Sequence, residues 1–249
     1  MNSPPLILVH GAWHDSRCWA LIAEILGDAG AEIHRPDLPG HGKNILPLNR
    51  ITLECYTKHL ELLLESLAVP AIVVAHSMSG IAVTQLASRK PHLIAGIIYI
   101  SAYLPLPGES LFDLMALNRE DGEATLVEHA LRMSTDKRSC TVEHESIIPL
   151  FYNECPDELA RQSAAMFSPQ ATLPLSSRTK YQSENLVSIP SSYICCTQDR
   201  VLPLQHQRHM IKRFGCKTLL QIEADHSPFY CVPELLSKML LATVSQADS

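Results

Sequence analysis

The fold is decided by residues 71–80, AIVVAHSMSG, where an apolar run leads into a serine-containing turn. The run 71–75 carries no charge and is typical of a strand buried on both faces, and residues 78–89 have a helical pattern. Small residues, Ala75 and Ser79, stand two positions before and two after Ser77. This layout is typical of a nucleophile elbow, a strained strand-to-helix turn that presents a serine hydroxyl. We therefore predict that Ser77 is a nucleophile; the alternative is an ordinary helix start capped by serines.

Strand-like and helix-like segments alternate on both sides of this stretch. The predicted strands cover residues 6–9, 31–37, 71–75, 94–101, 192–197 and 217–222. The predicted helices cover residues 17–29, 53–67, 78–89, 204–214 and a last segment starting near Pro233. Such an alternation predicts an α/β fold, with a mostly parallel sheet of about six strands flanked by helices.

The composition limits the class of protein. The chain has 249 residues, of which 46% are hydrophobic and 18% charged, and its net charge is −6. This is enough apolar material for a real core, and it excludes a disordered chain. The acidic balance, without a run of Lys or Arg, argues against nucleic acid and membrane surfaces as partners. The first residues lack the features of a secretory signal, so we expect a cytoplasmic protein; a homodimer is compatible with the sequence.

One segment differs in charge from the rest. Residues 104–188 hold 13 acidic and 7 basic residues, whereas the remaining chain is balanced. We therefore predict a lid of residues 104–188, inserted after the strand that ends near Ser101, and a core of residues 1–103 and 189–249.

The cysteines and paired histidines do not predict a metal site. The eight cysteines contain no CxxC pair, so we expect reduced, buried thiols and neither disulfides nor a zinc site. His206 and His209 lie three apart on a predicted helix without a nearby acidic or cysteine ligand, and we interpret both as surface residues. We expect no metal and no organic cofactor.

A base and an acid for Ser77 are found in loops at the carboxyl ends of the predicted strands, where chemistry sits in such sheets. His226 follows the last strand, and Asp199 follows the strand before it. The resulting chain order, Ser77 then Asp199 then His226, is that of one group of serine hydrolases. Asp225 and Asp37 are the alternative acids, but Asp225 adjoins the base in sequence and Asp37 precedes a turn.

Two backbone amides are predicted to bind an oxyanion. One is the amide of Met78, directly after the nucleophile, and the other is that of Ala12, with Trp13 as second choice. Gly11 lets this loop approach the site closely.

Five motifs together resemble the α/β-hydrolase superfamily, in the branch of plant methyl esterases, hydroxynitrile lyases, bacterial esterases and pyrethroid hydrolases. They are LILVHGAWHDSRCW at 6–19, DLPGHG at 37–42, VVAHSMSG at 73–80, CTQDRVLP at 196–203 and EADHSPF at 223–229. FYNECPDE at 151–158 resembles the lid of the bacterial esterases. The resemblance implies the α/β-hydrolase fold, a helical lid and acyl transfer by Ser77, His226 and Asp199. Ala75 and Ser79 depart from the glycines of the family's elbow.

The resemblance leaves a lyase as the rival to an esterase. Hydroxynitrile lyases carry a threonine after the first-strand histidine and a lysine after the base, where this chain has Gly11 and Ser227. We therefore favour hydrolysis of a small-to-medium hydrophobic ester, and keep a lyase or cyclase and a non-catalytic binding protein as alternatives. The predicted substrate-binding residues are Trp13, Leu104, Phe112, Phe151 and Phe167.

Overall fold

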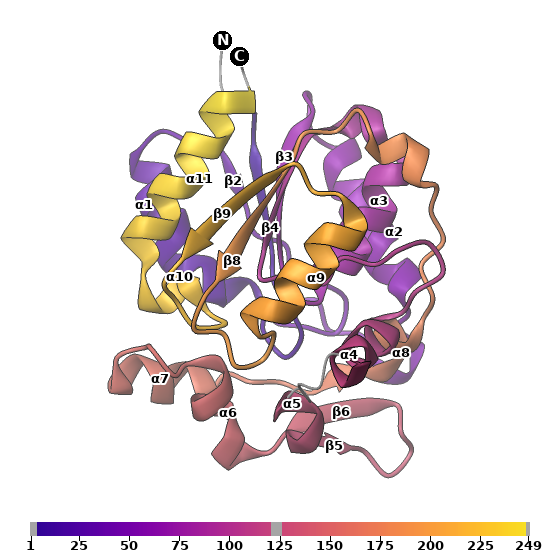
Figure 1. Ribbon diagram of the computed structural model, residues 1–249, viewed down its shortest axis with the longest axis vertical. Helices are drawn as coiled ribbons and strands as arrows, with labels where there is room; N and C mark the ends of the chain where they lie inside the picture. The colour runs from indigo at the N-terminus through magenta and orange to yellow at the C-terminus, as the bar shows by residue number, and fades with distance from the viewer. Residues whose placement is uncertain (1–3, 121–125, 248–249) are drawn as a thin grey trace.

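A six-stranded sheet, in which every neighbouring pair is parallel, forms the centre of the computed structural model, which describes residues 4–120 and 126–247. The strands are β1 (Leu6–Val9), β2 (Ile33–His34), β3 (Ala71–His76), β4 (Ile94–Ile100), β8 (Ser191–Cys196) and β9 (Thr218–Ile222). Their spatial order is β2-β1-β3-β4-β8-β9 (Figure 1). The predicted α/β class and number of strands are confirmed.

The apolar runs occupy the middle of the sheet. Every residue of β1 and β3 is buried, as expected for strands covered on both faces. The predicted strand over residues 31–37 is shorter, since only Ile33 and His34 pair with β1. Pro36 has no amide to donate to a ladder, which ends this edge strand early.

Helices cover both faces of the sheet. On one face α1 (Ala20–Asp28) packs against α11 (Pro233–Ala247), and on the other α2 (Leu53–Glu65) packs against α3 (Ser79–Arg89) (Figure 1). The helix α9 (Leu204–Phe214) packs on β8. The remaining short helices of this part are η1 (Ser16–Trp19), η2 (Leu48–Arg50), η3 (Pro91–Leu93) and α10 (Pro228–Cys231). None of the helices in the described ranges is long and apolar enough to cross a membrane.

The strand register brings the loops of interest to one edge of the sheet. Val9 of β1 pairs with Ala75 of β3, and His76 pairs with Ile100 of β4. The carboxyl ends of β8 and β9 reach the same edge through the pair Cys196 and Ile222. The turns after β1, β3, β4, β8 and β9 therefore converge on one region.

The segment between β4 and β8 lies across this edge. In Figure 1 most of it forms the lower end of the molecule, toward which the arrowheads of β8 and β9 point. Its elements are α4 (Leu111–Glu120), α5 (Leu126–Ala130), β5 (Leu131–Met133), β6 (Ser139–Val142), α6 (His144–Phe151), α7 (Asp157–Ala164), β7 (Gln170–Ala171), α8 (Thr172–Ser176) and η4 (Ser183–Leu186). We call residues 104–188 the lid; its division from a core of residues 1–103 and 189–249 remains a proposal.

The lid is mainly helical, as predicted, but it also contains a small sheet that the sequence did not predict. Strands β5, β6 and β7 form an antiparallel sheet of their own. These strands have two to four residues each, and β5 is largely exposed, so they carry no usable alternation of apolar and polar residues.

Candidate active site

Ser77 occupies a strained turn between β3 and α3. Its φ is +53°, in the left-handed region that non-glycine residues rarely adopt. The turn is crowded, because a Cβ on Gly80 would lie 2.3 Å from the carbonyl oxygen of Tyr103. The Ser79 hydroxyl donates to the carbonyl oxygen of His76 at 2.8 Å. A tight turn with this geometry fits the nucleophile elbow expected from the sequence.

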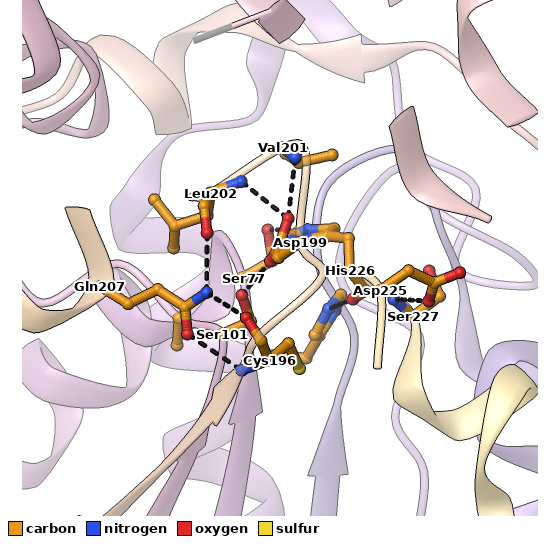
Figure 2. Close-up of polar contacts among 12 residues, drawn as sticks. Ser77, Ser101, Cys196, Asp199, Val201, Leu202, Gln207, Asp225, His226 and Ser227 are labelled. Carbon is orange, nitrogen blue, oxygen red and sulfur yellow. Dashed lines mark hydrogen bonds and ion pairs between the residues drawn. The ribbon is translucent and has the colours of Figure 1, made fainter. Parts of the chain in front are cut away.

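Three side chains distant in sequence form a continuous hydrogen-bonded chain at this turn. The Nε2 atom of His226 lies 3.0 Å from the Ser77 Oγ, and its Nδ1 lies 2.7 Å from the Asp199 Oδ2 (Figure 2). Since a carboxylate only accepts, Nδ1 is the donor to Asp199, and in the neutral ring Nε2 is the atom left to accept the proton of the Ser77 hydroxyl. His226 can therefore remove the proton of Ser77. The structure thus brings together the three residues predicted from the sequence.

Asp199 is fixed by donors on both carboxylate oxygens. Its Oδ1 accepts the amides of Val201 and Leu202, each at 2.8 Å, and its Oδ2 accepts the hydroxyl of Ser101 besides His226 (Figure 2). Ser101, at the end of β4, has a φ of +40° and is fully buried. The sequence analysis named Ser101 only as the end of a predicted strand and gave it no role. Together these donors hold the carboxylate of Asp199 in a single orientation.

Gln207 of α9 braces the loop that carries Asp199. Its amide nitrogen donates to the carbonyl oxygens of Cys196 and Leu202, and its Oε1 accepts the amide of Cys196 (Figure 2). The side chain is completely buried, so these bonds are shielded from competing water. No sequence motif pointed to this residue.

The two alternative acids are engaged elsewhere. Asp225 accepts the amides of Ser227 and Glu154, each at 2.9 Å. Asp37 accepts the amides of Ser16 and Lys43 and thereby builds a turn. Only Asp199, among these three carboxylates, is hydrogen-bonded to the imidazole of His226.

The loop after β1 approaches Ser77 closely. A Cβ on Gly11 would lie 2.9 Å from the Ser77 Cβ, and Trp13 has a φ of +62°. Within the described ranges, the amide nitrogens of Ala12 and Met78 have no hydrogen-bond acceptor. Met78 directly follows Ser77, and Ala12 directly follows Gly11, which approaches Ser77, so both amides stay the proposed oxyanion donors.

Buried neutral histidines hold the surrounding loops. His10 donates to the Gly11 carbonyl and accepts the Leu38 amide, and burial lowers its pKa to about 3. His76 donates from Nε2 to the carbonyl oxygen of His226, and burial lowers its pKa well below the usual value. Both rings are thus bonded to backbone groups of the loops around Ser77.

His14 links the loop after β1 to the lid, which the sequence did not predict. Its Nδ1 donates to the Ala12 carbonyl oxygen, and its Nε2 accepts the hydroxyl of Tyr152, both at 2.9 Å. Burial lowers the pKa of His14 to about 4, so the ring stays neutral and keeps this pair of roles at neutral pH. Tyr152 follows α6, so the bond joins parts of the chain 138 residues apart.

Three of the five predicted substrate-binding residues form an aromatic cluster beside the base. The ring of Phe151 lies 5.5 Å from that of His226, 5.7 Å from Trp13 and 4.9 Å from Phe167, centre to centre. Trp13 and Phe167 also line a cavity of about 250 Å³. Leu104 and Phe112 pack with the hydrophobic core, and no ring contact in the described ranges connects Phe112 with the triad residues. Their role in binding remains a prediction.

The interpretation of His206 as a surface residue was wrong. His206 is only 2% exposed, and its ring meets that of Tyr103 edge to face. It lies on the side of α9 that packs toward the sheet, as do Gln207 and Met210. Its partner in the sequence pattern, His209, is half-buried. All eight cysteines are free.

Comparison with known proteins finds relatives along almost the whole chain. The pyrethroid hydrolase of Sphingobium wenxiniae is 28% identical over 96% of this chain and 87% of its own length. Methylesterase 7 of Arabidopsis thaliana is 30% identical over 96% of both chains. The crystal structure of a pyrethroid hydrolase from Sphingobium faniae superposes with a TM-score of 0.88, at 26% identity and 97% coverage of both chains.

The family assignment agrees with the fold and with the arrangement at the elbow. The model of the alpha/beta hydrolase family matches residues 6–236, which include all six strands of the main sheet and the three hydrogen-bonded side chains. The chain therefore belongs to the alpha/beta hydrolase family.

Proposed function

We propose that this protein is a serine hydrolase that cleaves a small-to-medium hydrophobic carboxylic ester through an acyl-enzyme. The observation that carries the proposal is the bonded chain from Ser77 through His226 to Asp199, which starts at a serine with a φ of +53°. A serine hydroxyl is a poor nucleophile unless a neighbouring base takes its proton, and the Nε2 of His226 supports that role.

In the first half of the reaction, Ser77 attacks the ester carbonyl carbon while His226 accepts the hydroxyl proton. The negative charge that develops on the carbonyl oxygen is stabilised by the amides of Ala12 and Met78. The ester C–O bond then breaks, and the alcohol leaves with the proton from His226. Asp199 stabilises the imidazolium without taking its proton.

In the second half, water replaces the alcohol. His226 takes a proton from the water, the resulting hydroxide attacks the acyl carbon, and the Ser77 oxygen leaves with that proton. The products are a carboxylic acid and the free enzyme. All of these steps use groups of the chain itself.

The surroundings of the site favour an uncharged, apolar ester. The aromatic cluster of Trp13, Phe151 and Phe167 lies beside His226. The adjoining cavity, which none of the three hydrogen-bonded residues lines, has no Lys, Arg, Asp or Glu in its wall. Relatives named as a pyrethroid hydrolase and as methylesterases support the ester class. Ser77 is only 5% exposed, so residues around it have to move before an ester reaches its hydroxyl.

Two positions favour hydrolysis over cyanohydrin cleavage. Ser227, next to the base, supplies no cation for a leaving cyanide, and it is fully buried. Gly11 cannot hold a larger side chain without displacing Ser77, because the Cβ position is 2.9 Å from the Ser77 Cβ.

The test compares two reactions of the wild-type protein. We expect hydrolysis of short p-nitrophenyl esters, fastest for uncharged apolar acyl groups, and negligible release of cyanide from mandelonitrile. Cyanide release at a rate comparable to ester turnover would favour a lyase, and the absence of any turnover together with an unreactive Ser77 would favour a binding protein.

A further inference from the structure

Three potential metal ligands meet where the lid touches the loop of His226. Cys155 lies in the lid between α6 and α7, Asp225 precedes His226, and Cys231 ends α10. Their sulfur and carboxylate atoms all lie within 4.8 Å of one another, and no other group of three such residues occurs in the part of the chain that the structure describes. The three residues are not joined in one sequence motif, so the sequence did not predict this group.

The separations fit a small tetrahedral cation. Zn²⁺ binds sulfur at about 2.3 Å and carboxylate oxygen at about 2.0–2.2 Å, so neighbouring sulfur and oxygen ligands are about 3.5 Å apart. In the structure the Cys155 Sγ donates a hydrogen bond to the Asp225 Oδ2 at 3.5 Å, and the Cys231 Sγ donates one to the Oδ1 at 3.3 Å, so both separations are close to that value. An ion that takes the place of the two thiol protons would therefore meet sulfur and oxygen ligands near the required separation.

The carboxylate between the two thiols is already oriented for this purpose. Asp225 is fully buried, and its two oxygens accept the amides of Glu154 and Ser227 (Figure 2 shows the bond to Ser227). Hydrogen bonds of this kind commonly hold the carboxylate ligands of metal ions. Among the described residues no Lys, Arg or His forms an ion pair with Asp225. A bound cation would place a positive charge beside this carboxylate.

Two of the three residues are also partly exposed. Cys155 and Cys231 are both half-buried, whereas the carboxylate lies behind them. Three protein ligands leave the fourth tetrahedral position for water.

We propose that Cys155, Asp225 and Cys231 form a binding site for a thiophilic divalent cation, with Zn²⁺ as the best fit, that joins the lid to the loop of His226. On binding, each thiol loses its proton as its sulfur bonds the ion, so one Zn²⁺ displaces two protons from the cysteines. The ion thereby holds residues around Cys155 against the core. This proposal does not depend on the esterase reaction.

The test is a zinc titration of the reduced, metal-free protein, followed by calorimetry with proton counting. We expect one ion per chain, about two protons released, and binding that tightens as the pH rises. Replacing zinc by cobalt should give the sulfur-to-cobalt charge-transfer absorption of thiolate ligands. Zinc should also raise the unfolding temperature.

Matched variants separate this site from others. Cys155→Ser and Cys231→Ser should each weaken zinc binding by about 100-fold or more, since even the loss of a residue behind a ligand costs 10–100-fold. Each variant keeps one of the two thiolates, so the cobalt absorption should fall without vanishing, and the zinc-dependent rise in unfolding temperature should become smaller. Cys216→Ser, at another half-buried cysteine, should behave as the wild type. Absence of binding, or binding that neither Cys155→Ser nor Cys231→Ser weakens, would overturn the proposal; the unfolding curves of metal-free variants identify any that fail to fold.

Discussion

The carboxylate of Asp199 shows how single residues determine this site. Its four hydrogen-bond donors come from three parts of the chain, namely the end of β4, the loop after β8 and the loop after β9. Each donor satisfies one lone-pair direction, so the oxygen that meets His226 cannot rotate away. Such preorganisation matters because the imidazolium forms only transiently during the reaction.

Replacing the acid should be far more damaging than replacing its neighbour. Asp199→Asn presents an amide where Nδ1 of His226 needs an acceptor, so we expect kcat to fall by about 10⁴-fold. Asp225→Asn should cost much less, because Asp225 does not contact the imidazole. Steady-state hydrolysis of a p-nitrophenyl ester measures both; the opposite ranking would mean that Asp225 is the acid.

Ser101 should act on turnover through Asp199. A hydrogen bond to a charged group contributes about 1.5–3 kcal/mol, so Ser101→Ala should lower kcat by about 10-fold or more. The KM should change little, because the hydroxyl contacts Asp199 and not the substrate. Ser110→Ala is a suitable control, since the Ser110 hydroxyl bonds to Asp113 in the lid. An unchanged kcat in Ser101→Ala, or a loss confined to KM, would show that the Asp199 carboxylate does not need this donor.

At the scale of elements, the elbow depends on close packing of β3, α3 and the chain after β4. Ala75 and Ser79 replace the usual glycines without opening the turn, since both are fully buried and Ser79 bonds back to the carbonyl of His76. The glycine that the turn needs is Gly80, where the backbone of Tyr103 passes. The turn therefore has the backbone geometry of the family's elbow, although Ala75 and Ser79 stand where the family's sequence pattern has glycines.

The need for glycine at position 80 can be measured by comparing its replacement with that of a glycine in open surroundings, Gly27. In Gly80→Ala the new methyl group would meet the Tyr103 carbonyl oxygen at 2.3 Å, and backbone cannot move away cheaply, so we expect a loss of about 1–3 kcal/mol in the free energy of unfolding. In Gly27→Ala, within α1, nothing lies within 4 Å of the methyl group, and alanine should stabilise the helix by about 0.5–1 kcal/mol. Urea unfolding of both variants measures the two changes in the free energy of unfolding. Equal changes would contradict the crowding at the elbow.

At the scale of the whole molecule, buried histidines couple stability to pH. Burial lowers the pKa of His10 to about 3 and those of His14 and His41 to about 4, whereas an unfolded chain titrates near 6.5. Below pH 6.5 the unfolded state therefore binds protons that the folded state does not. The stability from these three groups is complete above about pH 6.5 and is lost as the pH falls toward 4.

The free energy of unfolding should depend steeply on pH, and mutation can show how much each histidine contributes to that slope. Each of the three groups contributes up to about 1.4 kcal/mol per pH unit between pH 6.5 and 4. His41→Gln should lower this slope by the contribution of one histidine, because it removes one titrating group and leaves His10 and His14. Urea unfolding between pH 7.5 and 4.5 tests this. A free energy of unfolding that stays constant across that range would mean that the histidines are protonated in the folded protein.

The sequence was most informative where one local pattern determines the structure. Uninterrupted apolar runs located β1 and β3 to within a residue, and the turn at Ser77 predicted the position of the site. By contrast, the bonds of Ser101 to Asp199 and of His14 to Tyr152 join residues 98 and 138 positions apart. Such bonds depend on how loops meet in three dimensions, which no local pattern encodes. The short strands of the lid were missed for a different reason: each is too short to show the alternation of apolar and polar residues that is typical of a strand.

The central claim is that Ser77 is an activated nucleophile, and covalent labelling tests it most directly. The protein is treated with an uncharged fluorophosphonate, its intact mass is measured, and the modified peptide is sequenced by mass spectrometry. We predict one adduct per chain on Ser77, formed rapidly in the wild type, much more slowly in Asp199→Asn, and absent in Ser77→Ala. Labelling of another residue, or a wild type that stays unlabelled while an unrelated serine hydrolase reacts under the same conditions, would contradict the account.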